Sequence, residues 1–301
     1  MTKPPRRRLD QVMVARGLAS SRQQAADLID RGGVLVSGTV AVKASRLVAP
    51  SEPVHLTGPR ARYVSRGGEK LAAALEQFGL DVAGARALDA GSSTGGFTDC
   101  LLQHGAVSVT SLDVGRGQLH ERLRNDERVD VREQTDVRSY SLEDAGTPYD
   151  VVTADLSFIS LTRGLPVLAG ELARPGADLV VLVKPQFEAG RSEASKGKGV
   201  IRDAAVHRRT LGEVCDALAA EGAHVTGAMP SPITGHAGNV EFLVHARAHA
   251  DTAPAAGGGT GAVIDDAVTG RMLDAAVTAA HDRADSAALA EVSHTTERDE
   301  S

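Results

Sequence analysis

The chain has 301 residues, 42% of them hydrophobic, which is enough to bury a core in one large domain together with a smaller one. No apolar run reaches the ~18 residues that a membrane span needs, and the arginine-rich start has no apolar stretch behind it to make a signal peptide, so we expect a soluble, cytoplasmic protein. The two cysteines lie far apart and lack histidines at metal-ligand spacing, so we expect neither a disulfide framework nor a metal site.

The net charge of −6 is distributed unevenly along the chain. Residues 1–66 hold twelve Lys or Arg against four Asp or Glu, whereas residues 250–301 hold three Arg against ten acidic residues. A polyanion is therefore attracted to the N-terminal end. We expect a small domain over 1–60, a larger domain over 61–249 and an acidic, mostly disordered tail from 250 onward, with at most a short helix around 268–281.

The N-terminal domain is expected to contain two helices followed by a small hairpin. Apolar residues at helical spacing from Leu9 predict a first helix that Gly17 ends, and a second begins near Ser21 and stops at a glycine pair. The period then changes to two in VLVSGTVAV, where the Ser-Gly pair predicts a tight turn between short strands.

The stretch GLASSRQQAADLIDRGGVLVSGTVA resembles the S4 domain of ribosomal protein S4, pseudouridine synthases and tyrosyl-tRNA synthetases. With the local positive charge, this resemblance favours RNA binding over a merely solvated basic face. Contacts of this kind go mostly to phosphates, so they position a protein without choosing a base. The basic residues expected on the RNA face are Arg6, Arg8, Arg16, Arg22, Arg31, Lys43 and Arg46.

From residue 65 to about 247 the chain alternates strands and helices. RALDAG, VTSLDV, YDVVTADL and DLVVLVKP each end an aliphatic run on a polar or turn residue, and helical patterns such as LTRGLPVLAGELA and HRRTLGEVCDALAAEG separate them. HVTGAMP and VEFLVHA are joined by a loop too short for a helix and should pair antiparallel at one edge. The predicted fold class is α/β: a mostly parallel, Rossmann-like sheet with helices on both faces, whose antiparallel edge resembles that of the methyltransferase variant of this fold, preceded by a small α+β domain that resembles S4.

The segment LDAGSSTGGFTDCLLQHG runs from a strand through a glycine-rich turn into a helix, where backbone N–H groups suit a nucleotide-like ligand. A glycine loop alone fits a packing turn or a dinucleotide site equally well, but this one resembles motif I of methyltransferases. Its glycines would let the backbone approach the ligand closely, and Asp113 at the end of the next strand can accept both ribose hydroxyls of an adenosyl group. The residues expected to bind S-adenosylmethionine are Asp89, Gly91, Ser92, Thr94, Gly95, Gly96, Phe97, Asp113 and Asp136.

Three acidic residues near this loop are interpreted separately. Asp89 would orient the loop or meet the methionine ammonium, and Asp136, after a third strand, would approach the adenine end. Asp99, inside the following helix, is interpreted mainly as structural.

Four charged residues stand at the ends of different elements: Lys70, Asp155, Lys184 and Glu241. Each alone is explained as well by an exposed charge or a buried ion pair. Lys184 is the most informative, because it ends a strongly apolar run and is followed by Pro185. Their joint position at the ends of elements favours a catalytic set.

This set matches the Lys-Asp-Lys-Glu tetrad of the FtsJ-like ribose 2′-O-methyltransferases, and an S4 domain joined through YVSRGGEKL resembles the TlyA (hemolysin A) family over roughly residues 6–247. The resemblance implies 2′-O-methylation of a cytidine in 16S and often 23S ribosomal RNA, with ribosomal RNA or ribosomal subunits as partners. Because a ribose hydroxyl is a poor nucleophile, the reaction needs proton removal or alkoxide stabilisation. We expect Lys184 to be the general base or the direct alkoxide partner, Lys70 to hold the ribose, and Asp155 and Glu241 to orient the lysines.

Two other functions stay open. A non-catalytic RNA-binding or ribosome-assembly factor would keep this fold, although the intact tetrad speaks against it. The hemolysin name points to membrane activity, yet the sequence has no span, no signal and no basic amphipathic helix with a broad aromatic face, and aromatic residues make up 3% of the chain.

Overall fold

The computed structural model of the chain describes residues 6–19, 22–30, 32–57, 62–197, 199–235, 238–248 and 266–299. The chain divides into two compact units, Met1–Ser65 and Arg66–Ser301. The sequence places this boundary after residue 60, five residues before the division between the units.

The first unit consists of two helices and short strands around an apolar core. Leu9, Met13, Ile29 and Val36 are each at most 1% exposed. The predicted helices and hairpin are confirmed, and the predicted helix cap near residue 21 lies outside the described residues. Strand β2 pairs antiparallel with β3 and β5, and β1 pairs antiparallel with β4. The elements are β1 (Arg7–Arg8), α1 (Leu9–Ala15), α2 (Arg22–Asp30), β2 (Val34–Val36), β3 (Thr39–Val40), β4 (Leu47–Val48) and β5 (Val54–Leu56).

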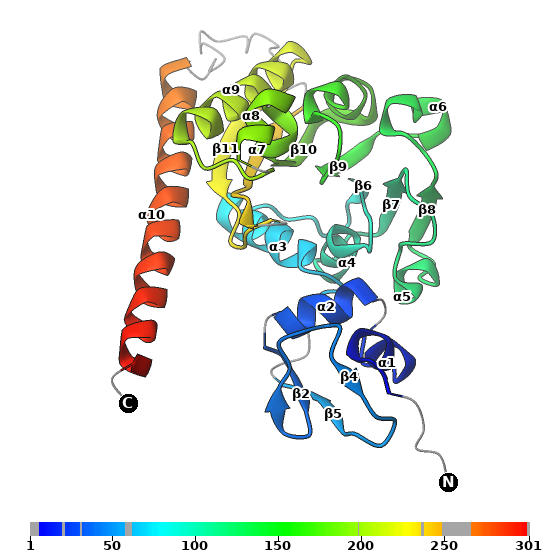
Figure 1. Cartoon of the computed structure of the whole chain (residues 1–301). Coiled ribbons are helices and arrows are strands. Elements are labelled where there is room, and N and C mark those ends of the chain that lie inside the picture. Colours follow the sequence, from blue (N-terminus) through cyan, green and yellow to red (C-terminus); the bar gives the residue numbers. More distant parts are fainter. Residues whose placement is uncertain are drawn as a thin grey trace, which may run out of the picture. The chain divides into compact units, whose positions relative to one another are not determined.

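The second unit is built on a seven-stranded sheet with the order β11-β12-β10-β9-β6-β7-β8 (Figure 1). The strands from β10 to β8 in this order are parallel, and β12 pairs antiparallel with both β10 and β11, as the sequence predicts for this edge. The strands are β6 (Arg86–Ala90), β7 (Ser108–Asp113), β8 (Val129–Glu133), β9 (Tyr149–Ala154), β10 (Ala173–Val183), β11 (His224–Pro230) and β12 (Phe242–Arg247).

Helices cover both faces of this sheet. On one face, strand residues such as Leu88, Val152 and Val181 belong to a hydrophobic cluster that also includes residues of η3, α9 and α10. Helix α3 contacts β12, and α4 contacts β6 and β7, through residues that are not part of this cluster. The predicted helix at LTRGLPVLAGELA forms as a short 3-10 turn, η2, followed by η3, a seven-residue π-helix that begins at Pro166. The helical segments are α3 (Gly67–Phe78), α4 (Gly96–Gln103), α5 (Glu121–Arg124), η1 (Val137–Ser139), α6 (Leu142–Ala145), η2 (Leu161–Arg163), η3 (Pro166–Leu172), α7 (Pro185–Glu188), α8 (Arg191–Lys196), α9 (Ala204–Ala220) and α10 (Asp266–Asp299).

The described part of the C-terminal segment differs from the mostly disordered tail that its composition predicts. Residues 266–299 form α10, a single long helix that packs on β11 and α9 (Figure 1). Leu273, Ala276, Val277 and Ala280 are at most 7% exposed and recur at helical spacing, so they form one buried stripe. The prediction of disorder used the average composition of residues 250–301, in which these few apolar positions do not stand out. Among the described helices, α10 included, none is long and apolar enough to cross a membrane.

Candidate active site

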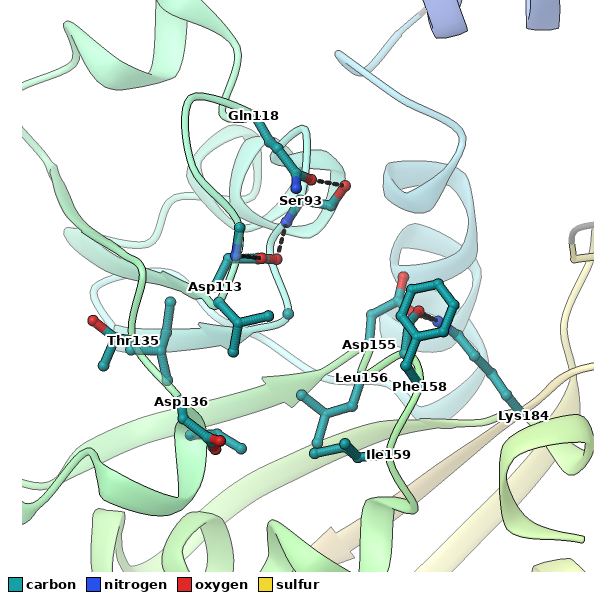
Figure 2. Close-up of a pocket in the computed structure, with 16 residues that line it drawn as sticks. Ser93, Asp113, Gln118, Thr135, Asp136, Asp155, Leu156, Phe158, Ile159 and Lys184 are labelled. Atoms are coloured by element: carbon teal, nitrogen blue, oxygen red, sulfur yellow. Dashed lines mark hydrogen bonds and ion pairs between the residues drawn. The ribbon is translucent and has the colours of Figure 1, made fainter. Parts of the chain in front are cut away.

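A cavity of about 350 Å³ lies over the carboxyl ends of β6, β7, β9 and β10. Figure 2 shows Asp113, Ser93 and Gln118 on one wall and Asp155, Phe158 and Lys184 on another. Ligands in open α/β sheets bind at this edge, so the topology makes the cavity the candidate site. It is lined by Gly91, Ser93, Leu112, Asp113, Val114, Gly115, Gln118, Thr135, Asp136, Val137, Asp155, Leu156, Ser157, Phe158, Ile159 and Lys184.

The four predicted catalytic residues form two ion pairs. Lys184 Nζ lies 2.6 Å from Asp155 Oδ1, and Lys70 Nζ lies 2.5 Å from Glu241 Oε2. Both lysines are 8% exposed, so each carboxylate compensates a buried charge. Asp155 and Lys184 line the cavity, whereas Lys70 and Glu241 lie outside its lining.

Lys184 has a second partner that sequence reasoning missed. Its Nζ donates a hydrogen bond of 2.7 Å to Ser157 Oγ, and Ser157 also lines the cavity. An ammonium group carries three N–H donors. Ser157 accepts one of them and Asp155 pairs with the charge, so the ammonium group keeps donor capacity for a ligand in the cavity.

Glu241 is seated by a close approach of the loop before β12. A Cβ built on Gly235 would lie 2.0 Å from Glu241 Oε1, so no side chain fits there without displacing the carboxylate. The backbone N–H of Gly235 donates to the carbonyl of Asn239 at 2.8 Å, which closes the loop. Gly235, in the loop SPITGHAGN, therefore leaves the space in which the Glu241 carboxylate pairs with Lys70.

The glycine-rich loop after β6 owes its glycines to contacts within the protein. Gly91 has a φ of 84°, and a Cβ there would lie 2.6 Å from the carbonyl oxygen of Asp155. At Gly95, with a φ of 92°, a Cβ would lie 2.3 Å from Leu123. Gly91 is therefore required by the end of β9 and Gly95 by α5, and the close approach of a ligand to these glycines stays a prediction, with Gly91 in the cavity lining.

Asp113 joins two loops that border the cavity. Its Oδ2 accepts from the backbone N–H of Ser93 at 2.8 Å, and its Oδ1 accepts from that of Gly115 at 2.6 Å. A carboxylate offers about four acceptor positions, so both oxygens keep capacity for a ligand. Asp136 also lines the cavity, and its side chain and backbone bonds with Arg138 hold its pKa at about 2.

Asp89 lies behind the cavity rather than in its wall. It is fully buried, and its Oδ2 accepts from the backbone N–H and the hydroxyl of Thr98 at 2.8 and 2.6 Å. Burial raises the pKa of Asp89 to about 7, against the opposing effect of Thr98. Its Oδ1 has no hydrogen-bond partner among the described residues. Asp89 therefore holds the first turn of α4, and its predicted roles toward the glycine loop and the methionine ammonium stay predictions.

Five predicted cofactor residues do not line the cavity. Helix α4 begins at Gly96 and carries the following side chains into the core, where Phe97 is 2% exposed. The adjacent Asp99 pairs with Arg122 at 2.6 Å, in keeping with its structural interpretation. The five residues are Ser92, Thr94, Gly95, Gly96 and Phe97.

Several lining residues were missed by sequence reasoning, Phe158 above all. It is 89% exposed, its backbone has a left-handed φ of 68°, and its ring lies 5.5 Å from that of Phe187. A bulky side chain rarely adopts this conformation, so the surrounding structure must hold Phe158 in it. An aromatic residue three positions after Asp155, in a chain with few aromatic residues, is the signal that was available.

In the first unit, two predicted RNA-face arginines share one buried carboxylate. Arg8 and Arg22 lie 3.0 and 2.9 Å from Asp10 Oδ2, and Arg8 is the larger cause that holds the pKa of Asp10 at about 2. Their side chains stay 40% and 60% exposed. Arg22 therefore holds α2 to α1, and Arg8 holds β1 to α1, while both side chains still face solvent.

Two further arginines of this set contact the segment before β5. Arg6 pairs with the Glu52 carboxylate at 3.0 Å, and Arg16 donates to the Glu52 carbonyl at 2.8 Å. The remaining predicted positions are Lys43 and Arg46, which are exposed and half-buried, and Arg31, which lies outside the described residues.

The strand order, the antiparallel edge and the cavity over the carboxyl ends of the parallel strands define a Rossmann-like methyltransferase. Comparison with protein families agrees with this class. Residues 63–248 match the FtsJ-like methyltransferase family, and residues 7–54 match the S4 domain.

Individual relatives place the chain more closely. The "16S/23S rRNA (cytidine-2'-O)-methyltransferase TlyA" of Mycobacterium tuberculosis is 46% identical over 264 residues, which cover 87% of this chain and 96% of the relative. "Hemolysin A" of Brachyspira hyodysenteriae is 39% identical over 239 residues, 79% of this chain and 98% of the relative. A solved structure from Streptococcus thermophilus, titled as a hemolysin, is 35% identical with a TM-score of 0.68 and covers 92% of this chain and 96% of that one. The chain therefore belongs to the TlyA family of FtsJ-like methyltransferases and carries an S4 domain before its FtsJ-like domain.

Proposed function

We propose that the chain methylates the ribose 2′-hydroxyl of a cytidine in ribosomal RNA with S-adenosylmethionine as methyl donor, in the cytoplasm. The observation that carries this proposal is Lys184, a nearly buried lysine that is held by Asp155 and Ser157 and still lines the cavity. The name of the Mycobacterium tuberculosis relative supports the choice of cytidine and of ribosomal RNA.

The cavity residues fit an adenosyl cofactor. The volume of about 350 Å³ falls within the ~300–1,000 Å³ usual for ligand pockets. Asp113 and Asp136 would hold the hydroxyl and amine hydrogens of the nucleoside, and Leu156 and Ile159 supply apolar surface for a base. When bound, S-adenosylmethionine supplies an electrophilic methyl group on a sulfonium centre.

Lys184 would act on the acceptor oxygen. Its ammonium group would donate a hydrogen bond to the ribose 2′-oxygen and stabilise the negative charge that develops there, while the hydroxyl proton passes to the carboxylate of Asp155, which faces the same cavity. Asp155 and Ser157 fix the position of this ammonium group, Asp155 through an ion pair at 2.6 Å and Ser157 as a hydrogen-bond acceptor at 2.7 Å. Lys70, paired with Glu241, would hold the ribose from outside the cavity lining.

Phe158 supports a nucleic acid substrate. An unstacked base presents a π-face that stacks on an exposed aromatic ring, which is how proteins commonly hold single nucleotides. The Phe158 ring lies 5.5 Å from the Phe187 ring, and Lys184 Nζ lies 5.8 Å from that same ring, so the exposed Phe158 would hold the target base while its ribose contacts the lysine (Figure 2). The basic first unit would bind neighbouring phosphates.

Product analysis tests the proposal. Wild-type protein is incubated with radiolabelled S-adenosylmethionine and with purified 30S particles, 50S particles or the corresponding free RNAs, and the RNA is digested to nucleosides. We expect the label in 2′-O-methylcytidine. Label on a base would contradict the proposed acceptor, and cofactor binding without transfer to any of these RNAs would favour a non-catalytic ribosome-assembly factor.

A further inference from the structure

The segment 114–120, between β7 and α5, forms one wall of the cavity through Val114, Gly115 and Gln118. We call it the wall loop. It contains no regular helix or strand, and Gly115 and Gly117 give it wide backbone freedom. Its shape must therefore come from bonds to residues outside the loop.

Glu133, the last residue of β8, supplies these bonds. Its Oε2 accepts from the backbone N–H of Gly117 at 2.8 Å, and its Oε1 accepts from those of Gln118 and Leu119 at 3.0 and 3.3 Å. Arg124 also pairs with Oε1 at 2.7 Å. One carboxylate, 15% exposed, thus satisfies three successive backbone donors of the wall loop.

The wall loop in turn touches the residues that face the cavity. Gln118 Oε1 accepts from Ser93 Oγ at 3.2 Å, and a Cβ on Gly115 would lie 2.1 Å from Gln118 Nε2, so this side chain lies directly on Gly115. Gly115 donates to Asp113 and accepts from the backbone N–H of Gln134 at 2.9 Å. A shift of the wall loop therefore moves Gln118 and frees one oxygen of Asp113.

We propose that Glu133 is a positioning residue for the bound cofactor, which holds the wall loop so that Gln118 and Asp113 face the nucleoside part of the ligand. The inference rests on the proposed function, because it assumes an adenosyl ligand beside Asp113. Glu133 itself is not among the residues that line the cavity.

The charge of Glu133 persists at every pH at which the protein is assayed. Burial opposes the charge, but the backbone donors of the wall loop and Arg124 outweigh it and hold the pKa of Glu133 at about 2. The wall loop is therefore held by a carboxylate rather than by a neutral acid, and such bonds are stronger than neutral ones.

The test compares Glu133→Ala and Glu133→Gln with wild type by calorimetry. The ligands are S-adenosylmethionine, S-adenosylhomocysteine and methylthioadenosine, the last of which lacks the amino-acid part. Loss of the charged bonds should weaken binding of all three by a similar factor, roughly tenfold to a hundredfold for Glu133→Ala and less for Glu133→Gln, which keeps one acceptor oxygen. The KM for RNA should stay at the wild-type value.

Two control variants separate positioning from general stability. Asp130→Asn removes a carboxylate of the same strand that pairs with Arg132 at 2.9 Å and is 51% exposed, and it should bind all three ligands as wild type does. Arg124→Ala removes the ion pair but leaves the three backbone bonds, so its affinities should change much less than those of Glu133→Ala.

Each result decides the inference. Wild-type affinity in both Glu133 variants, or a loss confined to the two ligands with an amino-acid part, would overturn it. Because Glu133→Gln keeps the shape of the side chain, it decides the matter even where Glu133→Ala fails to fold. A wild-type protein that binds none of the three ligands would overturn the proposed function as well, and this outcome is separate from a failure of the variants alone.

Discussion

The two lysine–carboxylate pairs of the site differ in how deeply their carboxylates are buried. Glu241 is 3% exposed, so its removal leaves the Lys70 charge buried and uncompensated. Asp155 is 22% exposed and borders the cavity, where solvent or a ligand meets Lys184. Substitutions of Lys70 or Glu241 should therefore change both the stability of the protein and the rate of methyl transfer. Substitutions of Lys184 or Asp155 should report the rate of methyl transfer more directly.

Asp89 predicts a pH dependence of folding. Its pKa of about 7 in the folded protein lies above the ordinary value of 3.8, so its contribution to stability is complete below about pH 4 and is lost as the pH rises to about 7. Asp89→Asn keeps a carbonyl acceptor for Thr98 and does not ionise. We expect this variant to unfold at higher urea than wild type at pH 8, with a gap that narrows as the pH falls to 4. A gap independent of pH would contradict this pKa.

At the scale of elements, α10 should stabilise the methyltransferase unit. Leu273 is 2% exposed in its buried stripe, so Leu273→Ala should cost about 2–5 kcal/mol of unfolding free energy in urea titrations. Val268 of the same helix is 43% exposed, and Val268→Ala should change stability little. Equal effects of the two substitutions would show that α10 does not dock through this stripe.

The loop after β9 should govern the RNA substrate rather than the cofactor. Glu188 of α7 accepts from the backbone N–H of Leu161 at 2.8 Å and from Ser160 Oγ at 2.6 Å, which ties the loop down beyond Phe158. Phe158→Ala should raise the KM for RNA roughly tenfold, because stacking on one base is worth ~1–3 kcal/mol, and should change cofactor affinity much less, although Phe158 also borders the cavity. Val107→Ala, at another exposed apolar residue, serves as control. A changed cofactor affinity with normal KM for RNA would contradict this role.

At the scale of the whole chain, the concentration of positive charge in residues 1–66 predicts salt-dependent binding of RNA. The double substitution Lys43→Ala with Arg46→Ala should lower the slope of log affinity against log salt by about 0.7–0.9 for each phosphate that the variant no longer neutralises. Arg209→Ala, at an arginine paired with Glu193 and Glu213, should leave the slope unchanged. Filter binding at several salt concentrations measures the slope for wild type and for each variant. Equal slopes for wild type, the double variant and Arg209→Ala would contradict an RNA face in the first unit.

Local sequence patterns predicted much of the fold. Aliphatic runs that end on Asp113, Asp155 and Lys184 marked strand ends, and carboxyl ends of parallel strands meet at one edge, so these residues were expected to converge. The antiparallel pairing of β11 with β12 was predicted because the loop between them is too short to hold a helix.

What the sequence did not reveal depends on interactions between distant residues. Gly91 packs closely against the carbonyl of Asp155, and Gly235 against the carboxylate of Glu241. A glycine motif in the sequence does not identify these partners. The bonds of Glu133 to the wall loop and the left-handed backbone of Phe158 likewise have no periodic signature. Helix α10 was underestimated because its docking surface on β11 and α9 comes from elsewhere in the chain.

The central claim, that Lys184 acts on the 2′-oxygen, is tested most directly by single-turnover methyl transfer with Lys184→Ala at saturating cofactor and RNA. We predict a rate lower by roughly 10²–10³-fold, the usual effect of removing a donor to a developing oxyanion, with binding of RNA and cofactor retained. A variant that binds both and transfers the methyl group at the wild-type rate would contradict the claim.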